Sequence, residues 1–294
     1  MGNKIGSSLA ALMGLAFVSC NASADDNPHS RPSGRLLLTG GVSQIEGSAG
    51  GGLVPWALIG GYGTRDQIGA TGYATYVKTD DFNLKSYGAL ASFSNRLEIS
   101  VARQDFDLED VGTALGLGAG FTIRQTTVGA KLRLFGDAVL EQDSWMPQVS
   151  VGIQYKDNNQ DDLVRSLGAK SGNGTDFYLS ASKLFLAQSI LANGTLRLTK
   201  ANQYGILGFG SDTSGYSTQL EGSVAYLLSR KFAIGGEYRF KPDNLAVAKE
   251  ENAFDVFMAY APTKNVSVTL AYADLGNIVV GSQKGLYASL QVGF

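Results

Sequence analysis

The feature that most constrains this chain is a repeated alternation of apolar and polar residues with a period of two. Successive side chains of a β-strand point to opposite faces, so this period indicates strands with one apolar face. At the C-terminal end Leu286, Ala288, Leu290, Val292 and Phe294 share one face, and small or polar residues stand between them. The pattern recurs along the sequence and predicts an all-β protein.

Marking every such run gives fourteen candidate strands. They span residues 35–47, 55–64, 67–78, 83–93, 96–106, 125–135, 147–157, 175–186, 190–200, 215–228, 231–241, 252–261, 265–274 and 285–294. The run 35–47 is the weakest, because Gly40 and Gly41 interrupt its apolar residues. All six prolines lie in the N-terminal tail, at strand starts or in connections, where proline removes no ladder hydrogen bond.

The connections alternate in length after the second strand. Tight connections are expected at 64–67, 93–96, 187–189, 229–230 and 262–264, and long polar ones at 107–124, 158–175, 201–215, 241–251 and 275–285. Two connections break this alternation. Connection 79–82 is short where a long one is expected, and connection 136–145 is long where a short one is expected. Short periplasmic turns and longer external loops are typical of outer-membrane barrels.

The alternative to a barrel is a soluble β-sandwich. Aromatic residues near strand ends on the apolar face favour the membrane, since such girdles lie at the lipid headgroups. They are Phe93, Tyr155, Tyr226, Phe232, Phe240, Phe254, Tyr260, Tyr272 and Phe294. A membrane-embedded sheet must close, because lipid satisfies no backbone group. We therefore expect a transmembrane antiparallel up-and-down β-barrel of about 14 strands, located in the bacterial outer membrane.

The first 24 residues have the pattern of a secretory signal peptide. Lys4 is the basic residue, residues 9–18 are apolar, and signal cleavage is expected after Ala24. The apolar run is too short for a membrane span, which needs roughly 20 residues. A rival interpretation makes Cys20, the only cysteine, a lipid-modified N-terminus.

The expected domain organisation after cleavage is simple. Residues 25–34 form a flexible tail, and residues 35–294 form a single outer-membrane barrel domain. Beyond residue 24 no stretch of 18 apolar residues occurs, which excludes a membrane protein built of helices. It leaves strands open, because each needs only about 9–11 residues. The terminal pattern of Leu290, Val292 and Phe294 resembles the signal that the outer-membrane assembly machinery reads.

Several classes of function are disfavoured. The formal charge is −2 with no long basic run, so no nucleic acid is expected as a partner. The only histidine, His29, lies in the tail, which disfavours Ser–His hydrolysis, and we expect neither an enzyme nor a cofactor. The segment Asp157–Asp162 offers oxygen ligands for Ca²⁺ or for a cation that bridges lipopolysaccharide phosphates, although a solvated acidic loop is the favoured interpretation, so no metal site is predicted.

The polar face of the predicted strands supplies the candidate site. By parity the pore-lining residues are Glu98, Lys131, Arg133, Gln154, Lys156, Arg197, Gln219, Glu221, Glu237 and Arg239. Rings of charged side chains are how pores select their solutes, and both signs are present here. The alternative is that these residues pair across the lumen and only fill it.

Two resemblances add to this interpretation. The block from Gly40 to Gly47, followed by residues 49–59 and 62–66, resembles an uncharacterised family of proteobacterial outer-membrane proteins, catalogued as a domain of unknown function; residues 36–76 carry the specific match. A looser likeness is to barrels from aromatic- and hydrocarbon-degradation clusters, some of which have an N-terminal segment in the lumen. If the N-terminal segment of this chain does the same, the barrel has 12 strands.

The sequence thus leads to one preferred function and one alternative. The first is a passive channel or transporter for small solutes, in contact with outer-membrane lipid and lipopolysaccharide. The second is a non-conducting structural or adhesion barrel that acts through its external loops. The missing histidine disfavours a third, a membrane hydrolase.

Overall fold

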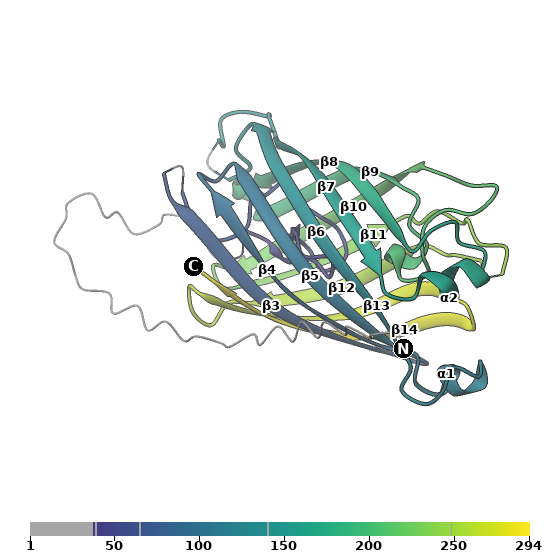
Figure 1. The fold of residues 1–294 in the computed structure, drawn as a ribbon. Coiled ribbons are helices and arrows are strands. Elements are labelled where there is room, and N and C mark those ends of the chain that lie inside the picture. The colour runs from purple at the N-terminus through teal and green to yellow at the C-terminus, as the bar shows by residue number, and fades with distance from the viewer. Residues whose placement is uncertain (1–37, 39, 65, 140, 248) are drawn as a thin grey trace, which may run out of the picture. The chain divides into compact units, whose positions relative to one another are not determined.

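The computed structural model describes residues 38, 40–64, 66–139, 141–247 and 249–294, and the expected signal segment, its cleavage site and Cys20 lie outside these residues. Within the described part twelve strands form one closed antiparallel sheet (Figure 1). Each strand pairs with its neighbours in sequence, and β14 closes the ring on β3 through Gly285–Thr79 to Gly293–Thr71. Closure leaves no unpaired strand edge, as a sheet in lipid requires.

The strands match the last twelve of the expected runs. They are β3 (Ile68–Thr79), β4 (Asn83–Phe93), β5 (Leu97–Asp107), β6 (Thr122–Phe135), β7 (Gln148–Asn158), β8 (Asn173–Phe185), β9 (Ile190–Thr199), β10 (Ser217–Ser229), β11 (Phe232–Arg239), β12 (Ala253–Tyr260), β13 (Val266–Ile278) and β14 (Gly281–Gly293). Period-two patterning located them because one face of each strand meets the barrel interior and the other does not.

The outer face of the barrel is apolar. Along β12 burial alternates strictly, and the exposed positions are Phe254, Val256, Met258 and Tyr260. Eight of the nine girdle aromatics are exposed, and the ninth, Phe232, is half-buried beside Tyr260. So broad an apolar surface on a soluble monomer would be exceptional, whereas acyl chains cover it in a membrane.

Where the structure describes them, the first two expected strands, 35–47 and 55–64, are not barrel strands. Residues 41–60 are buried throughout, without the alternation of a barrel strand. We call them the inner segment, because they lie inside the ring of strands (purple in Figure 1). Within this segment β1 (Val42–Ser43) pairs with β2 (Ala49–Gly50) in a small separate sheet. The lumen surrounds the segment, so apolar and polar residues are buried alike, and the count of 12 strands holds rather than 14.

The connections agree with the expected lengths except at one place. The expected long loop 275–285 is a tight turn, because β13 continues to Ile278 and β14 begins at Gly281 after a register shift between Asp274 and Asn277. By the convention of short periplasmic turns, Phe294 lies at the periplasmic end. Three long connections of the other, external end contain short helices: α1 (Glu109–Ala114), α2 (Asp161–Ser166) and η2 (Gln203–Gly205). At the periplasmic end η1 (Leu186–Gln188) joins β8 to β9.

No helix of the described residues is long and apolar enough to cross a membrane. At the C-terminal end Leu290 and Phe294 are exposed and Val292 is half-buried. Their role as a signal for the assembly machinery stays a prediction.

The outward face can be tested by placing a charge on it. Val256, in the middle of β12, is 64% exposed. The substitution Val256→Arg should lower the free energy of unfolding in lipid vesicles by about 2–4 kcal/mol, because it places a guanidinium among acyl chains. The matched control is Val280→Arg, in the β13–β14 turn outside the strands, which should cost less than about 1 kcal/mol. Equal costs at the two positions would argue against a lipid-facing β12.

Candidate functional site

The inner segment is held by an ion pair of the barrel wall. Lys131 on β6 lies 3.2 Å from Glu98 on β5, and both side chains are almost fully buried. The Lys131 ammonium donates to the carbonyl oxygens of Ala49 and Leu58, at 2.8 Å each. Glu98 accepts hydrogen bonds from the backbone N–H groups of Ala49 at 3.0 Å and Gly60 at 2.8 Å. The pair thus satisfies backbone groups that no strand of the barrel pairs with.

Other strands contact the segment further along. The Leu53 N–H donates to Glu237 of β11 at 2.6 Å, and the Trp56 indole donates to Ser223 of β10 at 2.9 Å. The Pro55 carbonyl accepts from Thr195 of β9 at 2.8 Å. On the opposite side of the ring, Ser86 of β4 donates to the Ile45 carbonyl at 2.6 Å. Contacts on so many sides hold the segment across the lumen rather than along one wall.

Toward the external ends of β7 to β11 the inner segment contributes one carboxylate to a buried group of ions. We call this group the central ion cluster: Glu46, Lys156, Asp176, Arg197, Glu221 and Arg239. Glu46 belongs to the inner segment, and the other five side chains belong to β7, β8, β9, β10 and β11.

Glu46 contacts all three cations of the cluster. The Arg239 guanidinium lies 2.9 Å from its carboxylate, the Arg197 guanidinium lies 3.7 Å away, and the Lys156 ammonium donates a short hydrogen bond to it. Lys156 also lies 2.7 Å from Asp176. Each of these side chains is at most 4% exposed.

The cluster explains why a polar segment is stable inside the barrel. Taking a charge out of water costs several kcal/mol unless it is paired and hydrogen-bonded. The wall alone supplies three cations and two carboxylates, an excess of one positive charge, and Glu46 balances it. The inner segment is therefore the electrostatic complement of the wall around it.

The glycine-rich run from Gly47 to Gly52 is part of the inner segment. A Cβ at Gly51 would lie 1.7 Å from the Glu237 carboxylate, closer than any side chain tolerates. Gly47 has a φ of +100°, which residues with a Cβ rarely adopt. These glycines let the backbone reach the wall groups that hold it.

A second segment covers the lumen from the external end. Residues 201–211, between β9 and β10, are buried throughout, and we call them the cap loop. The Tyr204 carbonyl accepts from Gln125 at 3.1 Å and from Lys156 at 3.3 Å, so the cap loop contacts the central ion cluster. The Arg239 guanidinium lies 4.3 Å from the centre of the Tyr204 ring, in cation–π contact.

Two buried ionisable groups next to the external strand ends hold the cap loop. Glu250 accepts from the Gln203 N–H at 3.0 Å, and the Lys241 ammonium donates to the Gln203 side chain at 2.9 Å. Burial raises the pKa of Glu250 to about 7, although the positive charge of Lys241 opposes the shift. Burial also lowers the pKa of Lys241 to about 8.

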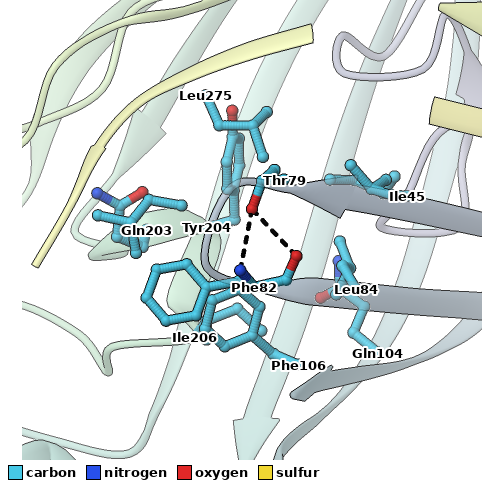
Figure 2. A pocket seen from close by; sticks show the side chains of 12 residues that line it. Ile45, Thr79, Phe82, Leu84, Gln104, Phe106, Gln203, Tyr204, Ile206 and Leu275 are labelled. Atoms are coloured by element: carbon cyan, nitrogen blue, oxygen red, sulfur yellow. Dashed lines mark hydrogen bonds between the residues drawn. The ribbon is translucent and has the colours of Figure 1, made fainter. Parts of the chain in front are cut away.

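Apolar cavities lie beside the cap loop. An inner cavity of about 30 Å³ lies between Ile45, Tyr204 and the side chains of β3, β4 and β5. Figure 2 shows Phe82 and Phe106 next to each other at its edge, with ring centres 4.9 Å apart. Thr79 accepts a hydrogen bond from the Phe82 N–H at 3.3 Å, which closes the short β3–β4 turn (Figure 2). A larger external cavity of about 340 Å³ shares Phe82 and Phe106 with it.

Eight of the ten residues predicted from strand parity are buried in the barrel interior. The structure brings Lys156, Arg197, Glu221 and Arg239 together in the central ion cluster. Gln154 accepts from Arg197 at 2.9 Å, and Glu98, Lys131 and Glu237 bind the inner segment.

The remaining two residues lie away from the cluster. Arg133 is half-buried near the periplasmic end, 3.5 Å from Asp137. Gln219, also half-buried, donates to Ser217 at 2.9 Å. Most charges of the lumen are thus paired with one another or with the inner segment, as expected of a filled lumen. Among the described residues Asp255 is an exception, because its Oδ1 atom has no hydrogen-bond partner.

Sequence reasoning missed two acidic wall residues and the key carboxylate. Asp176 and Asp255 stand on the inward face of β8 and β12 by the same parity that found the others, so the signal for them was present. Glu46 gave no such signal, because its segment was interpreted as a wall strand. In the loop considered for Ca²⁺, Asp161 accepts from Arg165 at 2.7 Å and from the Gly172 N–H at 2.5 Å.

Removing the charge of Glu46 should weaken the hold on the inner segment. The substitution Glu46→Gln keeps the shape but leaves a buried positive charge uncompensated, at a cost of about 3–5 kcal/mol in the free energy of unfolding. The control is Glu251→Gln at an exposed position, which should change it by less than about 0.5 kcal/mol. Urea titration in lipid vesicles measures both, and equal effects would contradict the role of the cluster.

The pKa of Glu250 predicts a pH dependence. Between its ordinary pKa of 4.5 and its folded value of about 7, Glu250 binds a proton more readily in the folded state. Its contribution to the free energy of unfolding should therefore decrease as pH rises through this window. The difference between wild type and Glu250→Gln, measured by urea titration at several pH values, should follow this trend and become flat above it. A difference that grows with pH would refute the assignment.

Comparisons with known proteins agree with this fold. The structure is similar to a KdgM porin in complex with disordered oligogalacturonate, at 12% sequence identity and a TM-score of 0.50, covering 76% of this chain and 99% of that chain. Weaker likenesses are to the COG4313 outer membrane channel from Pseudomonas putida F1 (13% identity, TM-score 0.45, 82% and 97% covered) and to outer membrane phospholipase A from Escherichia coli (10% identity, TM-score 0.45, 76% and 92% covered). At such identities the likeness shows the fold alone. A comparison with curated proteins finds no match.

The family is shown by a longer match than the sequence block suggested. A family model described as "Protein of unknown function (DUF3034)" matches residues 39–291, which include the inner segment and nearly the whole barrel. The closed barrel with its apolar outer face is an outer-membrane protein, and the chain belongs to the family of proteins of unknown function DUF3034.

Proposed function

We propose that this protein is a passive outer-membrane channel for small solutes, closed in its resting state by the inner segment and the cap loop. The observation that carries the proposal is the nature of the closure. Two segments fill the lumen together with paired wall side chains, and both segments are held in part through polar contacts to charged residues around them. Displacing a segment would leave a lumen lined with polar groups, as conducting barrels have.

The inner segment contacts the wall through polar groups as well as through apolar packing. Ile45, Trp56 and Leu58 pack in a buried apolar cluster with wall residues. The hydrogen bonds of the segment can be exchanged with water at a small net cost. The β1–β2 sheet is only two pairs long, so little regular structure holds the segment together. If the inner segment moved out of the lumen, the wall cations that pair with Glu46 would face the solute. The mixed positive and negative side chains of the wall would then select among solutes.

The second candidate is a non-conducting structural or adhesion barrel. The completeness of the filling favours it, because residues 41–60 and 201–211 are buried throughout. Under this alternative the external loops, with α1 and α2, would carry the function by binding a partner or lipopolysaccharide. Neither candidate assigns a catalytic role or a cofactor to the barrel.

A reversible cross-link separates the candidates. A Cβ at Gly47 would lie 3.0 Å from the Ala102 Cβ on β5. A small shift brings this to the Cβ–Cβ distance of about 3.5–4.5 Å that disulfides need. A Cβ at the positive φ of Gly47 strains the backbone, and the single variant Gly47→Cys carries the same strain as a control. The substitutions Gly47→Cys and Ala102→Cys therefore tie the inner segment to the wall, and Cys20, the only native cysteine, lies in the expected signal segment.

Uptake of small solutes into proteoliposomes is the measurement. The wild type and the reduced double variant should exceed protein-free vesicles, and the oxidised variant should not, because its inner segment cannot leave the lumen. Each single-cysteine variant, treated with the same oxidant, serves as the control and should behave like the reduced double variant. Uptake by the wild type no faster than by protein-free vesicles would favour the non-conducting barrel.

A further inference from the structure

The external end contains a cavity that the polar central ion cluster does not explain. It measures about 340 Å³ and lies between the short β3–β4 turn, the connections that contain α1 and α2, and Leu207 of the cap loop. Twelve of its thirteen lining residues are apolar, and the exception is Ser166. A cavity of roughly 150 Å³ lined in this way already holds benzene, so this one has room for a two-ring molecule.

The cavity is open to molecules from outside. Leu115, one of its lining residues, is 54% exposed. The side chains that form the bottom, Phe82 and Phe106, are buried and also line the inner cavity beside Tyr204. The two cavities share Phe82, Phe106 and Ile278, so these apolar side chains stand between the external cavity and the cap loop.

Polar groups in the inner cavity indicate a ligand that is more polar than a pure hydrocarbon. Gln104 and Tyr204 line the inner cavity, and both residues are more than nine-tenths buried. Among the described residues the Gln104 amide nitrogen and the Tyr204 hydroxyl have no hydrogen-bond partner. A buried polar atom is costly without a partner, so these two groups favour a molecule with one hydrogen-bonding end.

The charges around the cavity disfavour anions. Glu109 and Asp110 begin α1, and Asp161 and Asp162 begin α2, and both helices contribute lining residues. Arg165 and Lys78 each pair with one of these carboxylates, and negative charge remains in excess. A molecule that carries a carboxylate would meet repulsion at the entrance and lose its hydration inside.

We infer that the external cavity is a binding site for neutral, mostly apolar molecules of one or two rings that carry a single hydroxyl or carbonyl group. The apolar body occupies the external cavity, and the polar end displaces the shared Phe82 and Phe106 side chains to reach Gln104 and Tyr204 in the inner cavity. The inference assigns a class of solute to the proposed channel. That these molecules are transported rests on the proposed function. That they bind in the external cavity rests on the cavity alone.

Binding of 1-naphthol to the full chain in lipid nanodiscs tests the inference. Equilibrium dialysis against empty nanodiscs removes the contribution of partition into lipid. We expect saturable binding of 1-naphthol, no saturable binding of 1-naphthoate, and loss of binding in Leu163→Trp, which fills the cavity. Val247→Trp adds the same ring at an exposed loop position and should bind like the wild type.

A comparison of naphthalene with 1-naphthol separates the contribution of the apolar cavity from that of the polar groups. Tyr204→Phe should weaken 1-naphthol binding by roughly three- to tenfold, the value of one hydrogen bond, and leave naphthalene binding unchanged. Absence of saturable 1-naphthol binding, or equal binding in Leu163→Trp, would overturn the inference.

The proteoliposome assay keeps the two proposals apart. Saturable binding without uptake would refute the channel and leave the binding site standing. Uptake of small polar solutes without saturable 1-naphthol binding would support the channel and refute the binding site.

Discussion

The balance between one carboxylate and three buried cations underlies the rest of this structure. Glu46 lies among Lys156, Arg197 and Arg239, and the wall supplies only two further carboxylates to the same cluster. Without Glu46 an uncompensated positive charge would remain in the middle of a membrane protein, where water or a counter-ion would have to replace it. The closed lumen, the buried glycine run and the contact with the cap loop all follow from this placement.

The barrel itself was predictable because its physics is local. A strand between lipid and lumen must alternate, and alternation located β3 to β14 with small errors at their ends. The same parity placed Lys131, Arg197 and Arg239 on the inner face, and the burial of these side chains agrees. The exception among the connections, at 275–285, came from a register shift that no local pattern reveals.

The inner segment was harder to predict because its physics is not local. Its apolar residues at 54–59 resemble a strand, and only the surrounding wall decides that both faces are buried. Glu46 and Arg239 are 193 positions apart in the sequence, so their pairing could not be inferred from spacing. The likeness to barrels with an N-terminal segment in the lumen suggested this arrangement and the strand count of 12. No single residue of the sequence indicated either.

The lumen joins two chemical environments. Next to the external ends of β7 to β11 the lumen is polar and charged, whereas next to Phe82 and Phe106, on the side of β3 to β5, it is apolar. In the proposed channel an apolar molecule would collect at the entrance while the ions hold the passage closed. Movement of the cap loop, which contacts both environments through Tyr204, would couple them.

The central claim is that residues 41–60 reside inside the folded barrel. Hydrogen–deuterium exchange of the full chain in lipid vesicles tests it at individual backbone amides. Ala49, Leu53 and Gly60 donate to wall carboxylates, so their amides should exchange far more slowly than those of an unstructured peptide. Exchange of these amides at the unstructured rate, with the strands of the barrel still protected, would contradict the account.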